Sequence, residues 1–224
     1  KLGVENFYLY VKSFGFGTKT GLGFYGESPG ILRPIERYRQ VDLAVGSYGH
    51  GIAATPIQIL NAYSAVANGG SLMETRLVDR ITDADGKAVF SNKTAVIRRV
   101  VSPATNEKVK NILRNVVDRG TGKNAAVPGY AIAGKTGTSK KIDPKTGKYI
   151  TNKNVASFCG FFPLDKPQYT ILVILDNPKV LYYGGETAAP AFQEIAKKII
   201  TMKGLKPEKS LLERKPEPAV PVTD

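Results

Sequence analysis

The sequence predicts a domain of mixed α and β structure, in which an antiparallel sheet is flanked by helices. Three strand-like segments follow one another, at about residues 130–139, 154–162 and 168–176, and polar loops connect them. Sequential strands joined in this way are usually antiparallel neighbours. Helical patterns lie before and after the strands. Hydrophobic residues make up 42% of the chain and charged residues 23%, which is typical of a globular domain.

The first predicted helix begins at Thr55-Pro56, because threonine suits the N-cap and proline the first helical position. Asn68-Gly69-Gly70 ends it. The apolar residues between these signals recur at helical spacing, at Ile59, Leu60, Tyr63 and Val66.

Two further helices are predicted from the same kind of signal. One begins at Ser102-Pro103 and ends near Asp118, and the other runs from about Ala188 to Met202. The apolar face of the first consists of Val109, Ile112, Leu113 and Val116. The core face expected for the second consists of Phe192, Ile195 and Ile199, and Ala196 is a further candidate for it.

The remaining segments carry weaker signals. Residues 13–30 contain six glycines and are expected to be mostly irregular. Residues 76–82 and 87–90 are expected to be strands joined by the turn Asp83-Ala84-Asp85-Gly86. From Lys206 the chain is polar and rich in proline, so residues 204–224 are expected to form a tail or linker.

Composition excludes several classes of function. The net charge is +13, which attracts anionic partners. The basic residues are scattered, however, and no RNA-binding or zinc-finger signature occurs, so no nucleic-acid partner is expected.

Cys159 is the single cysteine and His50 the single histidine, which leaves no internal disulfide and no zinc site, and no cofactor or metal is expected. Cys159 lies in an apolar run and is expected to be a small core residue. No window approaches ~18 consecutive apolar residues.

Residues 129–136 match the phosphate-binding loop pattern G-x-x-x-x-G-K-[ST]. That loop needs a buried strand before its first glycine and a helix that starts at the lysine. The residues before Gly129 make a poor strand, and those after Thr136 include Gly137 and Pro144 and cannot make a useful helix. The context therefore predicts that Lys135 lies on a strand.

Lys135-Thr136-Gly137-Thr138 also contains K-T-G, one of the three motifs of penicillin-binding proteins and β-lactamases. On a strand, Lys135 supplies a fixed cation, and Gly137 lets an extended peptide approach the strand edge. Thr136 and Thr138 point to one face and offer hydroxyls to a carboxylate, and the N–H of Thr138 can donate to an oxyanion. The triplet alone is weak, because Lys145-Thr146-Gly147 repeats it in an expected hairpin turn.

Several segments of the sequence favour the penicillin-binding motif over the phosphate-binding loop as the interpretation of residues 129–138. They are residues 14–32 (FGFGTKTGLGFYGESPGIL), 46–63 (GSYGHGIAATPIQILNAY), 67–70 (ANGG), 120–122 (GTG), 129–138 (GYAIAGKTGT), 158–163 (FCGFFP), 182–185 (YYGG) and 189–192 (APAF). In this order they resemble the class B penicillin-binding proteins, specifically the division-type (septal) peptidoglycan D,D-transpeptidases. Residues 1–203 would then be the C-terminal part of a transpeptidase domain, with an α/β (α+β) penicillin-binding or serine β-lactamase-like fold that is incomplete on its N-terminal side.

The resemblance implies an acyl transfer on D-Ala-D-Ala stem peptides of peptidoglycan and acylation by β-lactams. Other cell-wall synthesis or division proteins are the implied partners. The implied location is the outer, periplasmic face of the bacterial cytoplasmic membrane, with an anchor that precedes this chain. Lys135, Thr136, Gly137 and Thr138 would form the catalytic wall.

Substrate or drug would contact Lys135, Thr136 and Thr138, together with the loop residues Tyr182, Tyr183 and Gly184. For each tyrosine, packing beneath the glycine loop is the equal alternative.

The other two family motifs, S-x-x-K and S-x-N, do not occur in this chain. Nucleophile and general base would therefore lie upstream, as would two of the family's five sheet strands. The full-length protein is expected to be a serine-type transpeptidase, and this chain alone is expected to be inactive. The alternatives are a penicillin-binding fold that senses or scaffolds without catalysis, and nucleotide binding through residues 129–136.

Overall fold

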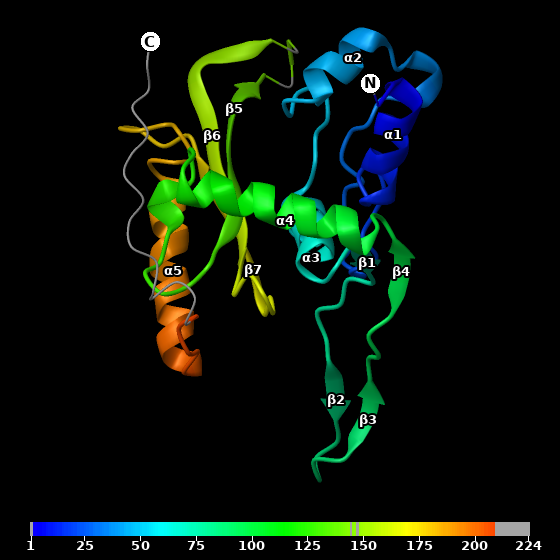
Figure 1. The fold of residues 1–224 in the computed structure, drawn as a ribbon. Helices are drawn as coiled ribbons and strands as arrows, with labels where there is room; N and C mark the ends of the chain where they lie inside the picture. The colour runs from blue at the N-terminus through cyan, green and yellow to red at the C-terminus, as the bar shows by residue number, and fades with distance from the viewer. Residues whose placement is uncertain (1, 144, 147, 209–224) are drawn as a thin grey trace. The chain divides into compact units, whose positions relative to one another are not determined.

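A computed structural model describes residues 2–143, 145–146 and 148–208 (Figure 1). The chain divides into two compact units, Lys1–Lys110 and Asn111–Asp224. The described elements are of mixed type, as the sequence predicts. Within the described ranges, the structure contains no helix with the length and apolar character needed to cross a lipid bilayer.

Before α4, the described part of the first unit contains the helices α1 (Val4–Ser13), α2 (Gln40–Gly46) and α3 (Pro56–Ala67) and the 3₁₀ turn η1 (Ile35–Arg37). The prediction of α3 is confirmed at both ends. Thr55 Oγ1 accepts from the N–H of Gln58, and Gln58 Oε1 accepts from the N–H of Thr55, which is a capping box. Helix α1 was not predicted from the sequence, because Gly3 provides no side-chain cap and none of the helix residues is buried.

Residues 13–30 are mostly irregular, as predicted, since α1 ends at Ser13 and residues 14–30 contain no described helix or strand. Gln58 holds this glycine-rich segment in place. The Gln58 amide is 1% exposed and donates from Nε2 to the carbonyls of Thr18 and Pro29, at 2.8 Å each. Gly30 has φ +71°, and a Cβ there would overlap the carbonyl oxygen of Ala53. A glycine is therefore required where the segment pairs with residue 53.

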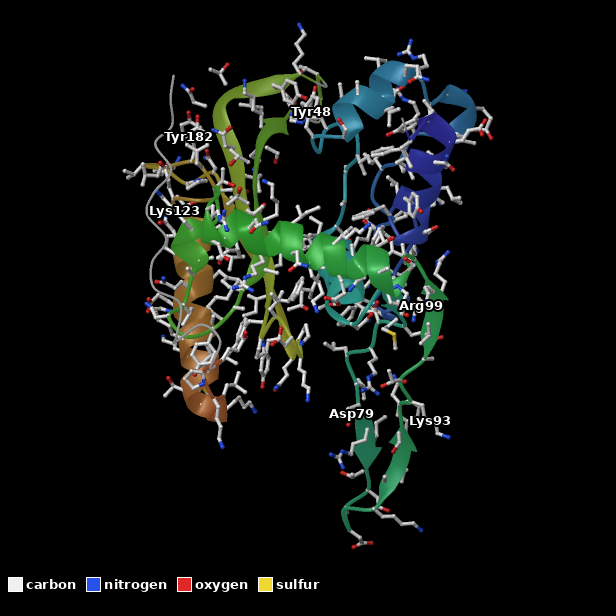
Figure 2. The ribbon with its side chains drawn as sticks, viewed as in Figure 1. Tyr48, Asp79, Lys93, Arg99, Lys123 and Tyr182 are labelled. Atoms are coloured by element: carbon white, nitrogen blue, oxygen red, sulfur yellow. The ribbon has the colours of Figure 1, made fainter. Side chains whose placement is uncertain are left out.

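Two small antiparallel sheets follow α3 in the first unit. Strand β1 (Ser71–Met73) pairs with β4 (Val96–Arg99), and β2 (Arg80–Thr82) pairs with β3 (Ala88–Ser91). The N–H of Gly86 donates to the carbonyl of Asp83 in the predicted turn. Figures 1 and 2 show β2 and β3 as a hairpin extending away from α3, with Asp79 and Lys93 at its base.

The predicted strand 76–82 is too long, since only residues 80–82 are paired. Arg76 instead directs its guanidinium to the carbonyl of Asn92 across the hairpin, at 2.7 Å.

Helix α4 (Pro103–Asp118) has the predicted bounds, but its predicted apolar face is partly wrong. Ile112 is 62% exposed, whereas Asn106 and Lys110 are buried. Asn106 is accommodated because its Nδ2 donates to the carbonyl of Val66, at 2.9 Å. The buried side follows positions 106, 110 and 117, and Ile112, two residues after Lys110, is rotated from it by about 200° and so points to the opposite side.

The second unit contains the 3₁₀ turn η2 (Lys123–Ala125), the strands β5 (Ala133–Ile142), β6 (Tyr149–Phe162) and β7 (Tyr169–Asp176), and helix α5 (Ala188–Lys203). The strands form one antiparallel sheet in the order β5-β6-β7, which confirms the predicted arrangement. β5 begins three residues later than predicted, because Val127 and Tyr130 form a local bridge before it.

The hairpin between β5 and β6 closes through the N–H of Asp143, which donates to the carbonyl of Lys148 at 2.9 Å. The second K-T-G triplet lies in this connection, as predicted. Its Gly147, like Pro144, falls outside the described residues.

Helix α5 packs on the sheet through β6 and β7 and encloses the core (Figure 1). Phe192 and Ala196 are fully buried, and the Phe192 ring meets the edge of Phe158 with centroids 4.7 Å apart. The prediction for Ile195 is wrong, because its side chain is 40% exposed. Cys159 is 3% exposed, which confirms it as a core residue.

The chain after α5 returns to the start of β5. Leu205 packs against the core, and its carbonyl accepts from the hydroxyl of Tyr130 at 2.7 Å. The N–H of Glu208 donates to the carbonyl of Gly129 at 2.8 Å. The expected tail continues into residues 209–224, which lie outside the described residues.

Candidate functional site

Lys135 lies on strand β5, where no helix begins, so the phosphate-loop reading of residues 129–136 is rejected. The glycine that precedes it serves packing. A Cβ on Gly134 would lie 2.5 Å from the ring of Phe158, which lies two residues before Gly160, the partner of Gly134 on β6. The glycine is thus explained by close contact inside the sheet.

The K-T-G-T residues lie on the outermost described strand of the three-stranded sheet. β5 pairs with β6 alone in the order β5-β6-β7. Lys135 and Thr138 are exposed, while Thr136 and Gly137 are half-buried. The backbone of such an edge strand is available to an added extended chain.

The Lys135 ammonium and the Thr136 hydroxyl meet at this edge. Lys135 Nζ donates to the carbonyl of Thr136 at 3.0 Å and approaches Thr136 Oγ1 at 3.4 Å. Thr136 Oγ1 is also 2.8 Å from Thr121 Oγ1. The site therefore contains a cation and two hydroxyls, which suit a carboxylate.

The loop between β7 and α5 brings the predicted loop residues to the same strand. The N–H of Gly184 donates to Thr138 Oγ1 at 3.1 Å. A Cβ on Gly184 would lie 2.5 Å from the carbonyl oxygen of Gly137 and would overlap that of Ser157. The absence of a side chain at Gly184 therefore allows the loop to lie directly on β5 and β6.

Tyr182, which is labelled in Figure 2, and its neighbour Tyr183 lie on this loop. They are 45% and 52% exposed, their ring centroids are 4.3 Å apart, and the Tyr182 hydroxyl donates to that of Tyr183 at 3.0 Å. This hydrogen bond raises the pKa of Tyr182, because ionisation would remove the donated proton. Both tyrosine rings are therefore accessible to solvent.

Two residues between α4 and β5 were not predicted as part of the site. Thr121 reaches the Thr136 hydroxyl, and Asn124 Nδ2 donates to the carbonyl of Gly185 at 2.7 Å. The sequence contains a partial signal, since Gly120-Thr121-Gly122 belongs to the segments that resemble the family. Nothing in that triplet indicates which distant residue it contacts.

The described residues offer neither a reactive thiol nor a cluster of metal ligands. Burial strongly raises the pKa of the Cys159 thiol, which keeps it protonated and unsuited to nucleophilic attack. Among the residues that the structure describes, no three His, Cys, Asp or Glu side chains gather closely enough to hold a metal ion.

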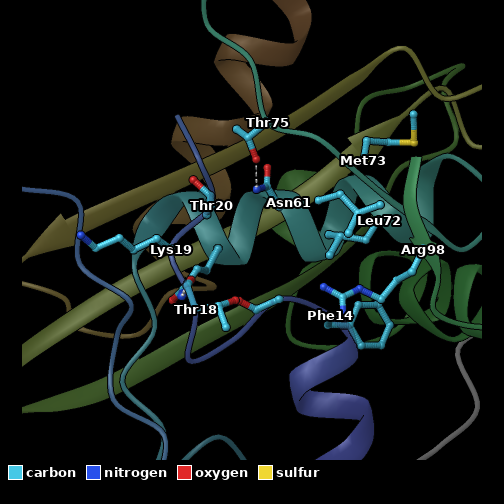
Figure 3. A pocket seen from close by; sticks show the side chains of 12 residues that line it. Phe14, Thr18, Lys19, Thr20, Asn61, Leu72, Met73, Thr75 and Arg98 are labelled. Atoms are coloured by element: carbon cyan, nitrogen blue, oxygen red, sulfur yellow. Dashed lines mark hydrogen bonds between the residues drawn. The ribbon is translucent and has the colours of Figure 1, made fainter. Parts of the chain in front are cut away.

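A cavity of about 50 Å³ lies in the first unit, beside the hydrogen-bonded side chains of Asn61 and Thr75 (Figure 3). Phe14, Leu72 and Arg98 line it as well. It has room for a few water molecules and is too small for a peptide.

Comparison with known proteins gives close relatives for almost the whole chain. Stage V sporulation protein D of Bacillus subtilis is 40% identical over 217 residues, which cover 96% of this chain and 33% of the relative. A probable peptidoglycan D,D-transpeptidase, PenA, of Neisseria gonorrhoeae is 32% identical over 213 residues, covering 94% and 34%. The chain thus spans about a third of the length of these relatives.

Solved structures give the same result for the fold. Penicillin-binding protein 3 of Mycobacterium tuberculosis, in complex with ampicillin, matches with a TM-score of 0.84 at 35% identity. The match covers 92% of this chain and 48% of that one. The family model of the penicillin-binding protein transpeptidase domain matches residues 1–197. The chain therefore belongs to the penicillin-binding protein transpeptidase domain family.

Proposed function

We propose that this chain forms one wall of the active site of a serine-type peptidoglycan D,D-transpeptidase that acts in cell-wall synthesis at division. The observation that carries the proposal is the hydrogen bond between Gly184 and Thr138. It joins the K-T-G-T edge of β5 to the connection between β7 and α5 that contains Tyr182 and Tyr183, here called the tyrosine loop. The relative from Neisseria gonorrhoeae is itself named a probable peptidoglycan D,D-transpeptidase, which supports this choice.

The proposed reaction has two steps, and its nucleophile lies outside this chain, since no S-x-x-K occurs here. A serine hydroxyl attacks the carbonyl carbon of the D-Ala–D-Ala amide, the C–N bond breaks, and the released D-Ala amine receives a proton. An amine of a neighbouring stem peptide then attacks the acyl ester. The serine oxygen leaves with a proton and a new amide joins the two stems.

This chain's residues bind and orient the stem peptide in both steps. The peptide adds to the free edge of β5, where Gly137 allows close approach. Lys135 and the hydroxyls of Thr136 and Thr138 hold the terminal carboxylate. The N–H of Thr138 donates to the oxyanion of the tetrahedral intermediate.

The tyrosine loop completes the proposed wall. Tyr182 and Tyr183 lie beside the side chains of the stem peptide, and Gly184 keeps the loop against the strand. A β-lactam with a carboxylate occupies the same groups and acylates the serine. We infer from this chemistry that the site acts on the periplasmic side of the cytoplasmic membrane, together with other proteins of cell-wall synthesis or division.

Labelling with a fluorescent penicillin tests the proposal in the full-length protein. The wild type is expected to label covalently, and Lys135→Ala is expected to label about 10- to 100-fold more slowly, because a hydrogen bond to a charged group is lost. Lys145→Ala is the matched control, since Lys145 is an exposed lysine of a K-T-G triplet in the hairpin connection, and it is expected to label like the wild type.

A folded full-length protein that does not label would refute the enzymatic proposal. Such a protein that still bound penicillin reversibly would be a sensor or scaffold with the same fold. Equal labelling of the Lys135→Ala variant and the wild type would show that Lys135 does not contribute to binding at this site.

A further inference from the structure

We propose that Thr121 is a positioning residue, which turns the Thr136 hydroxyl so that its proton points at the carboxylate of the stem peptide or β-lactam. The inference rests on the function proposed above and adds to it a residue outside the K-T-G-T strand. Thr121 Oγ1 lies 2.8 Å from Thr136 Oγ1, within hydrogen-bond distance.

The backbone around Thr121 is fixed on both sides. The N–H groups of Gly120 and Gly122 both donate to the carbonyl of Val116, at 3.1 and 2.9 Å, where α4 ends. A Cβ on Gly185 would overlap the carbonyl oxygen of Thr121, so the tyrosine loop abuts the same peptide unit. Thr121 is therefore held at a set distance from the strand, as a positioning residue must be.

A count of donors and acceptors gives the direction of the hydrogen bond. The Thr136 hydroxyl has one proton and two lone pairs. Lys135 Nζ can only donate, and it approaches one lone pair at 3.4 Å. When a carboxylate arrives, it accepts the Thr136 proton, since a hydrogen bond to an anion is about twice as strong as a neutral one. Thr121 then donates to the second lone pair.

The hydroxyls of Thr121 and Thr136 thus form a chain of hydrogen-bond donors that ends on the carboxylate of the ligand. Thr121 donates to Thr136, and Thr136 donates to the carboxylate, so that each bond polarises the next. Without the Thr121 hydroxyl, Thr136 is free to rotate and loses a donor behind its oxygen. The exposed position of Thr121 means that it can be replaced without opening the buried core.

Acylation of the full-length protein by benzylpenicillin tests the inference. Thr121→Val, which is nearly isosteric, is expected to lower the second-order acylation rate constant about three- to tenfold, the usual net effect of one hydrogen bond. Thr121→Ser keeps the hydroxyl and is expected to stay within about twofold of the wild type. If Thr121→Val melts at a lower temperature, the pair Thr121→Ala and Thr121→Ser gives the same comparison.

A double-mutant cycle distinguishes positioning from independent binding. If Thr121 acts through Thr136, the double variant Thr121→Val/Thr136→Val is no slower than Thr136→Val alone. The methyl ester of benzylpenicillin lacks the anion, so Thr121→Val and the wild type should react with it equally. A merely structural role would slow both ligands alike.

Three outcomes would overturn the inference. The first is a Thr121→Val variant that is acylated by benzylpenicillin as fast as the wild type. The second is an equal loss of rate toward the acid and the ester. The third is a double variant in which the effects of the two substitutions multiply. A wild type that is not acylated at all would instead overturn the proposed function, and this inference with it.

Discussion

The N–H of Gly184 donates to the Thr138 hydroxyl over 3.1 Å and thereby joins two segments that are 46 residues apart in the chain. One segment is the K-T-G-T strand and the other is the loop with the two exposed tyrosines. The contact requires that residue 184 have no side chain, because the carbonyl oxygens of Gly137 and Ser157 occupy the space of a Cβ. The shape of the proposed site therefore depends on this glycine.

Gly184→Ala is expected to push the loop away from β5 and to destabilise the transpeptidase domain by about 1–3 kcal/mol, as overpacking does. Its melting temperature and its rate of penicillin labelling in the full-length protein should both fall. Lys179→Ala, at an exposed position of the same loop, is the control and should change neither. A Gly184→Ala variant with unchanged stability and labelling would contradict the close approach.

Phe192→Ala is expected to cost about 3–5 kcal/mol, because the ring is fully buried between Phe158 and Phe162 and leaves a cavity. Ile195→Ala, on the same helix, should cost much less, since Ile195 is 40% exposed. Thermal unfolding of the two variants measures the difference. Similar losses for both would show that α5 is rotated relative to the structure.

Gln58→Leu is expected to release the glycine-rich segment from α3. The substitution leaves the carbonyls of Thr18 and Pro29 and the N–H of Thr55 without their partner, at about 1–3 kcal/mol for each group that stays buried. Tryptic cleavage after Lys19 should become faster. Gln40→Leu makes the same change at an exposed position and should leave the cleavage rate unaltered.

Glu208 gives a pH dependence with a defined sign. Burial raises its pKa above the ordinary 4.5, and the N–H of Ala131, which donates to the carboxylate, partly opposes this. Asp165 raises the pKa further and Arg114 lowers it. The folded protein thus holds the proton more tightly than the unfolded chain, so the free energy of unfolding falls as pH rises from about 4.5 through the raised pKa.

Glu208→Gln should accordingly melt at a higher temperature than the wild type at pH 7, and this gain should vanish below pH ~4, where both side chains are neutral. Glu194→Gln is the control of opposite sign. Its hydrogen bond to Lys197 lowers the pKa of Glu194, so that variant should melt slightly lower at pH 7. A Glu208→Gln variant that melts lower at pH 7 would contradict the assigned cause.

The sequence predicts elements whose signals lie within a few residues of each other. Thr55 and Pro56 mark the start of α3, and Ser102 and Pro103 that of α4, because capping is a contact between near neighbours. The periodicity that identifies a helix is less exact about its buried face. Ile112 and Ile195 are apolar and recur at helical spacing with the other apolar residues of their helices, yet both are exposed.

The sequence by itself determined the family, the order and antiparallel pairing of the three long strands, and the strand position of Lys135. Tertiary structure alone decided that Thr121 meets Thr136, that Gln58 holds the glycine-rich segment, and that Gly184 lies on Thr138. The physical reason is separation along the chain. These pairs are 15, 40 and 46 residues apart, and a side chain carries no local mark of the distant atom that satisfies its hydrogen bond.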